Sequence, residues 1–254
     1  MGRWIFPLLF PLLAPHIGLA FVRLSPEAAT AFERCAAQAD QRMREAPIGS
    51  PNLASGELRI EAGSLGKDMQ ALGGTIQDWV GTMFIPGATL RRARAALEDY
   101  AHYKVFYAPK VIDSRELAHQ GDEYDVSLRL VEKHLITVVL NTTYHVRYSM
   151  PDSEHLLVSS RSTHIGEVKH PDDSYTDEYP EGDDTGFLWR LNSYWRFRAA
   201  DGGVYARCEA VSLSRDIPLG LGWMLKGFID SFPQQSMLNT LRGTRDAILA
   251  RKGG

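Results

Sequence analysis

The chain has 254 residues, of which 44% are hydrophobic and 23% charged, a composition typical of a globular protein. Its formal net charge of −3 excludes the basic character that nucleic-acid-binding proteins normally show, so we expect no nucleic-acid partner. Two cysteines, Cys35 and Cys208, are too few for a disulfide framework in a chain of this length. One bond between them is allowed in an exported protein, but two buried thiols are the favoured interpretation.

Residues 1–20 have the layout of a secretory signal peptide. Arg3 gives a positive start, an apolar run follows over residues 4–14, and residues 18–20 are small enough for a cleavage site. Prolines interrupt the run, which is shorter than the roughly 20 residues that span a membrane. We therefore predict cleavage and a periplasmic or secreted mature protein. A retained N-terminal anchor and a buried core segment are the alternatives.

A helical arm is predicted over residues 21–74. Ser25 suits the N-cap of a helix, Pro26 suits its first turn, and Pro47 ends the helix-forming stretch. Few large apolar side chains lie in this arm, so we do not expect a domain of its own. We expect the arm to pack on the outside of the domain that follows.

From residue 75 onward the pattern is that of a sheet with short helices near its start. A strand is predicted over 75–85, a helix over 89–100 and a helical turn over 103–109. In the runs that follow, apolar and polar residues alternate, which indicates a sheet with one dry face and one wet face. The six runs are 111–117, 124–133, 135–149, 156–168, 187–198 and 204–215.

The fifth run shows the alternation well. Trp189, Leu191, Trp195 and Phe197 all lie at odd positions, and the arginines of this run lie at even ones. The pattern predicts that both tryptophans share the dry face of the sheet.

A C-terminal helix is predicted over residues 223–251, and Pro233 either breaks it or starts its continuation. Met237, Leu241 and Ile248 belong to an apolar stripe that must lie on another element. A sheet with one dry face needs a cover, and this helix is the available one. Six or seven curved strands cannot close tightly around one helix everywhere, so we expect a cavity between them.

Three segments resemble parts of exported bacterial START-like proteins of the Bet v 1-like superfamily. Residues 79–89 resemble the first strand and helix entry, residues 186–197 the penultimate strand, and residues 202–218 the last strand and its exit. The resemblance covers residues 75–251. It implies an α+β helix-grip fold, in which a curved antiparallel sheet wraps around a long C-terminal helix. The superfamily includes lipid carriers, hormone receptors, polyketide cyclases and oxygenase domains, and the fold does not choose among them.

Motifs for metals, cofactors and nucleophilic catalysis are missing. The eight histidines have no tight ligand spacing, and the sequence has no Cys-x-x-Cys and no Gly-x-Ser-x-Gly. We therefore predict no metal and no cofactor. His145 and His164 lie on neighbouring predicted strands, and the unliganded interpretation is favoured for both.

The candidate ligand-binding residues are aromatic or charged residues of the sheet and the last helix. Glu209 lies in a strand that suits burial, so it needs a partner, and Arg161 or Arg215 is expected to supply it. A structural ion pair is the favoured interpretation, with a polar ligand anchor and a general acid or base as alternatives. The predicted ligand-binding set is Trp79, Tyr144, Arg161, Trp189, Trp195, Glu209 and Trp223.

The leading hypothesis is non-enzymatic binding or carriage of a hydrophobic small molecule or lipid, with transient membrane contact allowed. It depends on the resemblance, the export signal and the missing catalytic motifs. A cofactor-independent enzyme of the polyketide cyclase or aromatase type is the first alternative. A structural or interaction module, built on residues 21–74, is the second. The sequence leaves the ligand and the oligomeric state open.

Overall fold

The computed structural model describes residues 22–45, 53, 56–64, 69–71, 73–133, 137–172, 175–215 and 222–251, with the backbone alone for 22 and 222–233. The predicted signal peptide lies outside the described residues, and its cleavage stays a prediction. Among the described residues, no helix is both long enough and apolar enough to span a membrane.

A helix of 20 residues lies near the start of the described chain and one of 29 residues near its end, and three shorter helical segments lie between them. They are α1 (Pro26–Glu45), α2 (Leu90–Leu97), the 3-10 segment η1 (Tyr100–His102), α3 (Tyr103–Phe106) and α4 (Gly222–Ala250). Of the two alternatives at Pro233, the break is excluded, because α4 continues through this residue as one helix. Ser25 caps α1 as expected, since its Oγ accepts a hydrogen bond from the Ala28 N–H at 3.0 Å.

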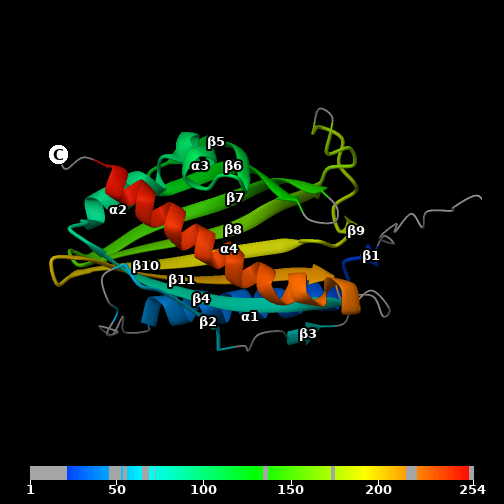
Figure 1. Cartoon of the computed structure of the whole chain (residues 1–254), viewed down its shortest axis with the longest axis horizontal. Helices are drawn as coiled ribbons and strands as arrows, with labels where there is room; N and C mark the ends of the chain where they lie inside the picture. The colour runs from blue at the N-terminus through cyan, green and yellow to red at the C-terminus, as the bar shows by residue number, and fades with distance from the viewer. Residues whose placement is uncertain are drawn as a thin grey trace, which may run out of the picture.

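An antiparallel sheet forms the body of the molecule (Figure 1). Its strands are β2 (Leu58–Ala62), β3 (Met69–Ala71), β4 (Gly74–Pro86), β5 (Val111–Gln120), β6 (Glu123–Lys133), β7 (Thr137–Asp152), β8 (His155–Glu167), β10 (Arg190–Ala200) and β11 (Gly203–Arg215). They lie in the order β2–β4–β11–β10–β8–β7–β6–β5, with β3 also paired to β4. A separate two-stranded ribbon joins β1 (Val22–Arg23) to β9 (Asp183–Asp184).

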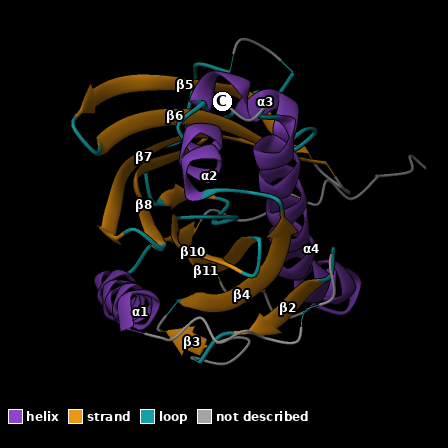
Figure 2. Ribbon diagram, turned by 90° about the vertical axis from the view of Figure 1, so that its left-hand side faces the viewer, coloured by secondary structure: helices purple, strands orange, loops and turns teal. Residues whose placement is uncertain are grey.

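The curved sheet has α4 on its concave face and α1 on its outer face (Figure 2). The close approach of α4 to β4 depends on Gly81, where an added Cβ would lie 2.8 Å from side-chain atoms of both Met237 and Leu241. Both of these side chains are buried in the main core, as the apolar stripe predicts. This arrangement confirms the predicted α+β helix-grip fold.

The predicted helical arm contributes to both the outer face and the sheet. Phe32, Ala39 and Met43 of α1 form a second core with Tyr194 of β10 and Leu213 of β11. The remainder of the arm supplies β2 and β3, which extend the sheet beyond β4. The arm therefore packs on the chain's own sheet, which argues against the interaction-module alternative.

The two cysteines lie on opposite faces of the sheet. Cys208 belongs to the core on the concave face, and Cys35 belongs to the core beneath α1. Both are buried free thiols, as the favoured interpretation expects.

Candidate ligand-binding cavity

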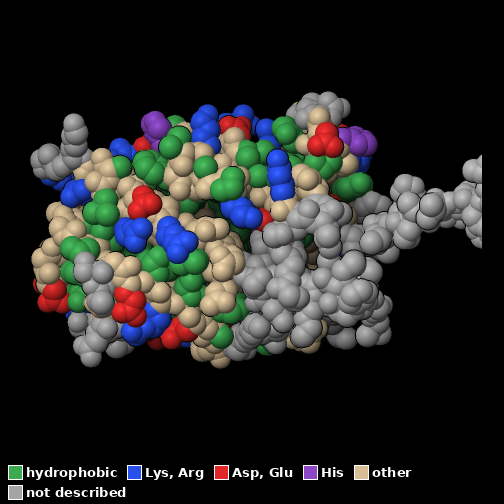
Figure 3. Space-filling view, in the orientation of Figure 1, with side chains coloured by type: hydrophobic (Ala, Val, Ile, Leu, Met, Phe, Trp, Pro, Cys, Tyr) green, Lys and Arg blue, Asp and Glu red, His purple; other side chains and the backbone are tan. Residues whose placement is uncertain are grey.

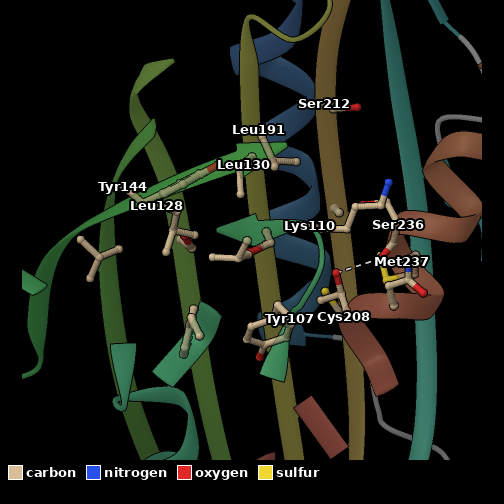
Figure 4. Close-up of a pocket in the computed structure, with 18 of the residues that line it drawn as sticks. Tyr107, Lys110, Leu128, Leu130, Tyr144, Leu191, Cys208, Ser212, Ser236 and Met237 are labelled. Carbon is tan, nitrogen blue, oxygen red and sulfur yellow. Dashed lines mark hydrogen bonds between the residues drawn. The ribbon is translucent and has the colours of Figure 1, made fainter. Parts of the chain in front are cut away.

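A cavity of about 300 Å³ lies between the concave face of the sheet, the segment around α3, and α4. Figure 4 looks onto this face, with Ser212 and Cys208 on β11 and Ser236 and Met237 on α4. Most of the lining side chains are aliphatic or aromatic. The volume lies at the lower end of the range for small-molecule sites, roughly 300 to 1,000 Å³.

Hydrogen-bonded tyrosines form one wall of the cavity. The hydroxyls of Tyr100 and Tyr148 are 2.8 Å apart, and Tyr148 also lies in reach of the Leu97 carbonyl oxygen at 2.9 Å. Tyr103 donates to the same carbonyl at 2.6 Å. Burial raises the pKa of all three phenols above the usual value, so they remain neutral. This wall is held in place by its own hydrogen bonds.

Two further tyrosines face the cavity from different elements (Figure 4). Tyr107 follows α3, and its hydroxyl lies 2.9 Å from Thr244 Oγ1 of α4, which ties the two elements together. Tyr144 comes from β7 and is buried. Burial raises the pKa of Tyr107 and of Tyr144 to about 12, so both phenols are neutral at physiological pH.

An ion pair between Lys110 and Glu132 also belongs to the cavity wall. The Glu132 side chain is 12% exposed and that of Lys110 33%, so the pair is partly shielded from water. Among the lining residues that the structure describes, Lys110 is the one cation and Glu132 the one carboxylate. The two opposite charges are adjacent on the cavity wall.

Sequence reasoning missed this ion pair, although a signal for it exists. Glu132 continues the inward-facing series of Val126, Leu128 and Leu130 on β6. An acidic residue at the end of an apolar period-two series marks a carboxylate directed at the concave face. The partner could not be found this way, because Lys110 precedes β5 and lies in no periodic pattern.

Three of the seven predicted ligand-binding residues line the cavity. They are Trp79 of β4, Tyr144 of β7 and Trp195 of β10. Tyr144 and Trp195 belong to the inward-facing series of their strands, as the alternation predicts. A fourth, Trp223, has no described side chain and stays a prediction.

Trp189 does not reach the cavity, contrary to the prediction from alternation. Strand β10 begins at Arg190, one residue later, so Trp189 lies outside the alternating ladder. Gly186 with φ +72° turns the chain before it, and the Trp189 indole N–H donates to Asp184 Oδ1 at 2.9 Å. The ring is therefore buried in the core beneath α1.

Arg161 and Glu209 also lie on the outer face, and the predicted partners of Glu209 were wrong. Arg161 bonds Asp40 of α1 at 2.8 Å, and Arg215 donates to the Thr185 carbonyl oxygen at 3.0 Å. Glu209 is paired with Arg42 of α1, whose Nε lies 3.1 Å from Glu209 Oε1. The correction follows from strand geometry, because Cys208 and Ala210 point into the cavity and the residue between them points away.

The described residues contain no cluster of three or more His, Cys, Asp or Glu that could hold a metal ion. His145 and His164 are each bonded to carboxylates, with His145 Nδ1 2.8 Å from Asp125 Oδ1 and His164 Nε2 2.8 Å from Glu178 Oε2. On the face drawn in Figure 3, basic, acidic and hydrophobic side chains are interspersed over the described part.

No family model and no curated protein matches this sequence. Similar solved structures include a STAR-related lipid transfer protein of Xanthomonas axonopodis (fragment 25–204), with 16% identity, a TM-score of 0.48, and 71% of this chain and 96% of that chain covered. Human STARD10 has 11% identity and a TM-score of 0.48, with 91% of this chain and 83% of that chain covered. The Zhui aromatase/cyclase of Streptomyces sp. R1128 has 10% identity and a TM-score of 0.48, with 69% of this chain and 95% of that chain covered. The strand order and the position of the C-terminal helix on the concave face of the sheet are those of a helix-grip fold.

Proposed function

We propose that this protein binds or carries a hydrophobic small molecule in the cavity between sheet and α4. The observation that carries the proposal is the cavity itself, about 300 Å³ of space lined mainly by aliphatic and aromatic side chains. Apolar walls with a few fixed polar groups are the usual make-up of small-molecule sites. The neutral tyrosines and the Lys110–Glu132 ion pair add a few polar groups to the cavity wall.

The size of the cavity favours one compact ligand or one acyl chain over a complete two-chain lipid. A volume of about 300 Å³ is the lower limit for drug-sized ligands. Transfer of such a ligand from water gains roughly 25 cal/mol for each Å² of apolar surface that is buried. Affinity then depends on shape and on the few polar contacts.

The test uses two neighbouring serines of β8. Ser160 lines the cavity, whereas Ser159 lies on the other face of the same strand. We expect Ser160→Phe to fill the cavity and abolish binding of the neutral fluorescent probe N-phenyl-1-naphthylamine. Ser159→Phe is the matched control and should retain binding. Native mass spectrometry of protein purified from its own host should show a copurified ligand that Ser160→Phe lacks.

Equal binding by both variants, with no copurified ligand, would exclude the cavity as the binding site. Loss of binding in both would point to a folding defect, which circular dichroism of each variant detects. Loss in Ser160→Phe alone supports the proposal.

A second candidate function is a cofactor-independent enzyme of the cyclase or aromatase type. The observation in its favour is the Lys110–Glu132 pair, because both groups are titratable and both line the cavity. An acid or base placed beside a bound substrate can transfer protons during ring closure. Turnover of a poly-keto substrate by wild type and not by Glu132→Gln would favour this function. Binding of the same substrate without conversion favours the carrier.

A further inference from the structure

The connection between β9 and β10 supplies part of the cavity wall. Residues 185–188 belong to this connection, which leads from the paired strands β1 and β9 (Figure 1), and we name them the connecting segment. Phe187 and Leu188 line the cavity and pack against the core group that contains Leu140 of β7. Tyr148, of the tyrosine wall, lies toward the other end of β7. The connecting segment therefore belongs to the cavity end that is away from the hydrogen-bonded tyrosines.

Two buried carboxylates hold the connecting segment in place. Glu167, the last residue of β8, is 6% exposed, and its Oε2 accepts a hydrogen bond from Thr185 Oγ1 at 2.5 Å. Asp184 of β9 is 2% exposed. Its Oδ1 accepts hydrogen bonds from the Gly186 N–H at 2.7 Å and from the Trp189 indole N–H at 2.9 Å. The two carboxylates thus fix both flanks of the segment that carries the lining side chains.

Glu167 is a titratable group at this attachment. Burial raises its pKa to about 7, the negative charge of Asp184 raises it further, and the positive charge of Arg215 of β11 lowers it. Arg215 also binds the connecting segment, because its Nη1 donates to the Thr185 carbonyl oxygen at 3.0 Å. The Glu167 carboxyl therefore changes its charge near neutral pH while the surrounding hydrogen bonds keep it enclosed.

Ionisation of Glu167 favours displacement of the connecting segment. An ionised carboxylate is unfavourable inside a protein, and the cost is relieved when the group reaches water. Thr185 and Asp184 lie against Glu167, so their displacement exposes its carboxyl to water. The displaced form binds the proton less tightly than the closed form. Displacement therefore becomes more frequent as the pH rises.

Resting on the proposed function, we infer that residues 185–188 are a pH-dependent gate of the cavity, closed over protonated Glu167 and opened more often when this carboxyl is ionised. The gate controls how fast a ligand enters and leaves. The closed form remains the main one, so a rise in pH accelerates entry and release together and changes the affinity little.

The test measures release of the probe N-phenyl-1-naphthylamine after rapid dilution in a stopped-flow fluorimeter. Between pH 5 and 8 we expect the dissociation rate constant of wild type to rise roughly 10- to 100-fold, and Kd to change by less than about 3-fold. Glu167→Gln keeps an oxygen that can accept from Thr185 but cannot ionise. Its release should be as slow as that of wild type at pH 5 over the whole range.

The matched control is His164→Gln, which removes another titratable group of β8. The His164 ring lies 2.8 Å from Glu178 Oε2 and 3.4 Å from Glu181 Oε2, in the chain that precedes β9. This variant should keep the pH dependence of wild type. If Glu167→Gln does not fold, Asp184→Asn gives a second comparison. It retains the acceptor oxygen and removes a charge that acts on Glu167, so its release should depend less on pH.

A wild-type release rate that stays constant between pH 5 and 8, or a rise that persists unchanged in Glu167→Gln, would overturn the gate while leaving cavity binding intact. Circular dichroism at each pH verifies that release is measured from folded protein. Failure of the proposed function has a different signature, in which Ser160→Phe does not affect probe binding at all.

Discussion

Arg42, in the first helix, is hydrogen-bonded to Glu209, in the last strand, with Nε 3.1 Å from Oε1. Arg42 Nη2 also lies 3.3 Å from Asp78 Oδ2 of β4. The Asp78 side chain is 0% exposed and that of Glu209 is 1% exposed, so one guanidinium serves two buried carboxylates. This cluster fastens α1 to the outer face of the sheet, away from the cavity.

The first prediction concerns this cluster. Arg42→Ala should lower the free energy of unfolding by about 3 to 5 kcal/mol, because it removes the guanidinium that is bonded to the buried Glu209 carboxylate. That is a large share of the roughly 5 to 15 kcal/mol of a typical domain. Glu209→Gln should cost much less, since it removes one of the two negative charges. Urea denaturation measures both.

The control is Arg34→Ala, which changes an exposed arginine of the same helix. Its midpoint of urea denaturation should equal that of the wild-type protein. A wild-type midpoint for Arg42→Ala would show that the cluster contributes nothing to stability.

The second prediction is a pH dependence that originates at Glu167. Burial raises the pKa of Glu167 from 4.5 to about 7. The hydrogen bond that Thr185 Oγ1 donates at 2.5 Å acts in the opposite direction, and the negative charge of Asp184 acts in the same direction as burial. A raised carboxyl pKa means that the folded state binds the proton more tightly. The contribution of Glu167 to the free energy of unfolding is therefore fully present below about pH 4.5 and is lost as the pH rises through about 7.

Glu167→Gln removes this titration. Between pH 4.5 and 8 we expect wild type to lose about 3 kcal/mol more than the variant, from the size of the pKa shift. Urea denaturation across this range gives the two curves. Glu154→Gln, at an exposed position, should follow wild type, and parallel curves for wild type and Glu167→Gln would contradict the prediction.

The third prediction concerns the two thiols. Burial raises the pKa of both Cys35 and Cys208 above the usual value, which lowers the thiolate fraction. Native protein should therefore react slowly with a thiol-specific disulfide reagent, and unfolded protein should release two equivalents of the coloured product. A protein without free thiols after unfolding would show that the two cysteines are joined.

The fourth prediction follows from our proposal that residues 1–20 are a cleaved export signal. Expressed with its own N-terminus in a Gram-negative host, the protein should be found in the periplasmic fraction with a mature chain beginning near Phe21. Intact-mass measurement identifies the new N-terminus. Leu9→Arg, in the middle of the apolar run, should retain the uncleaved chain in the cell, because a charge there disrupts the apolar segment. An uncleaved wild-type chain would refute the proposal.

Most of the sheet could be predicted from the sequence, because period-two alternation is a local property. The strand predicted over 75–85 is β4 (Gly74–Pro86), and the run predicted over 204–215 is β11 (Gly203–Arg215). The position of the C-terminal helix on the dry face of the sheet could also be predicted from the sequence. Its apolar stripe of Met237, Leu241 and Ile248 can be buried only against a second apolar surface.

Part of the site could not be predicted, for identifiable reasons. Trp189 was expected inside the cavity, but β10 begins at Arg190, three residues after the predicted start, which leaves Trp189 outside the alternation. Strand β3 has no clear apolar period, since its side chains are exposed or only half-buried. For β2, the sequence shows only a short alternating piece over residues 58–60. The position of Lys110 depends on contacts with β6 and has no local signature.

The sequence by itself determined the long strands of the sheet, the long helices and most of the alternation along those strands. Only the tertiary structure decided that Glu209 bonds Arg42 and that a mainly apolar cavity remains beneath α4. Alternation says that two residues point in opposite directions, but it does not say which direction is the cavity. That choice depends on which helix packs on which face, and this is decided by contacts between residues as far apart as the first helix and the last strand.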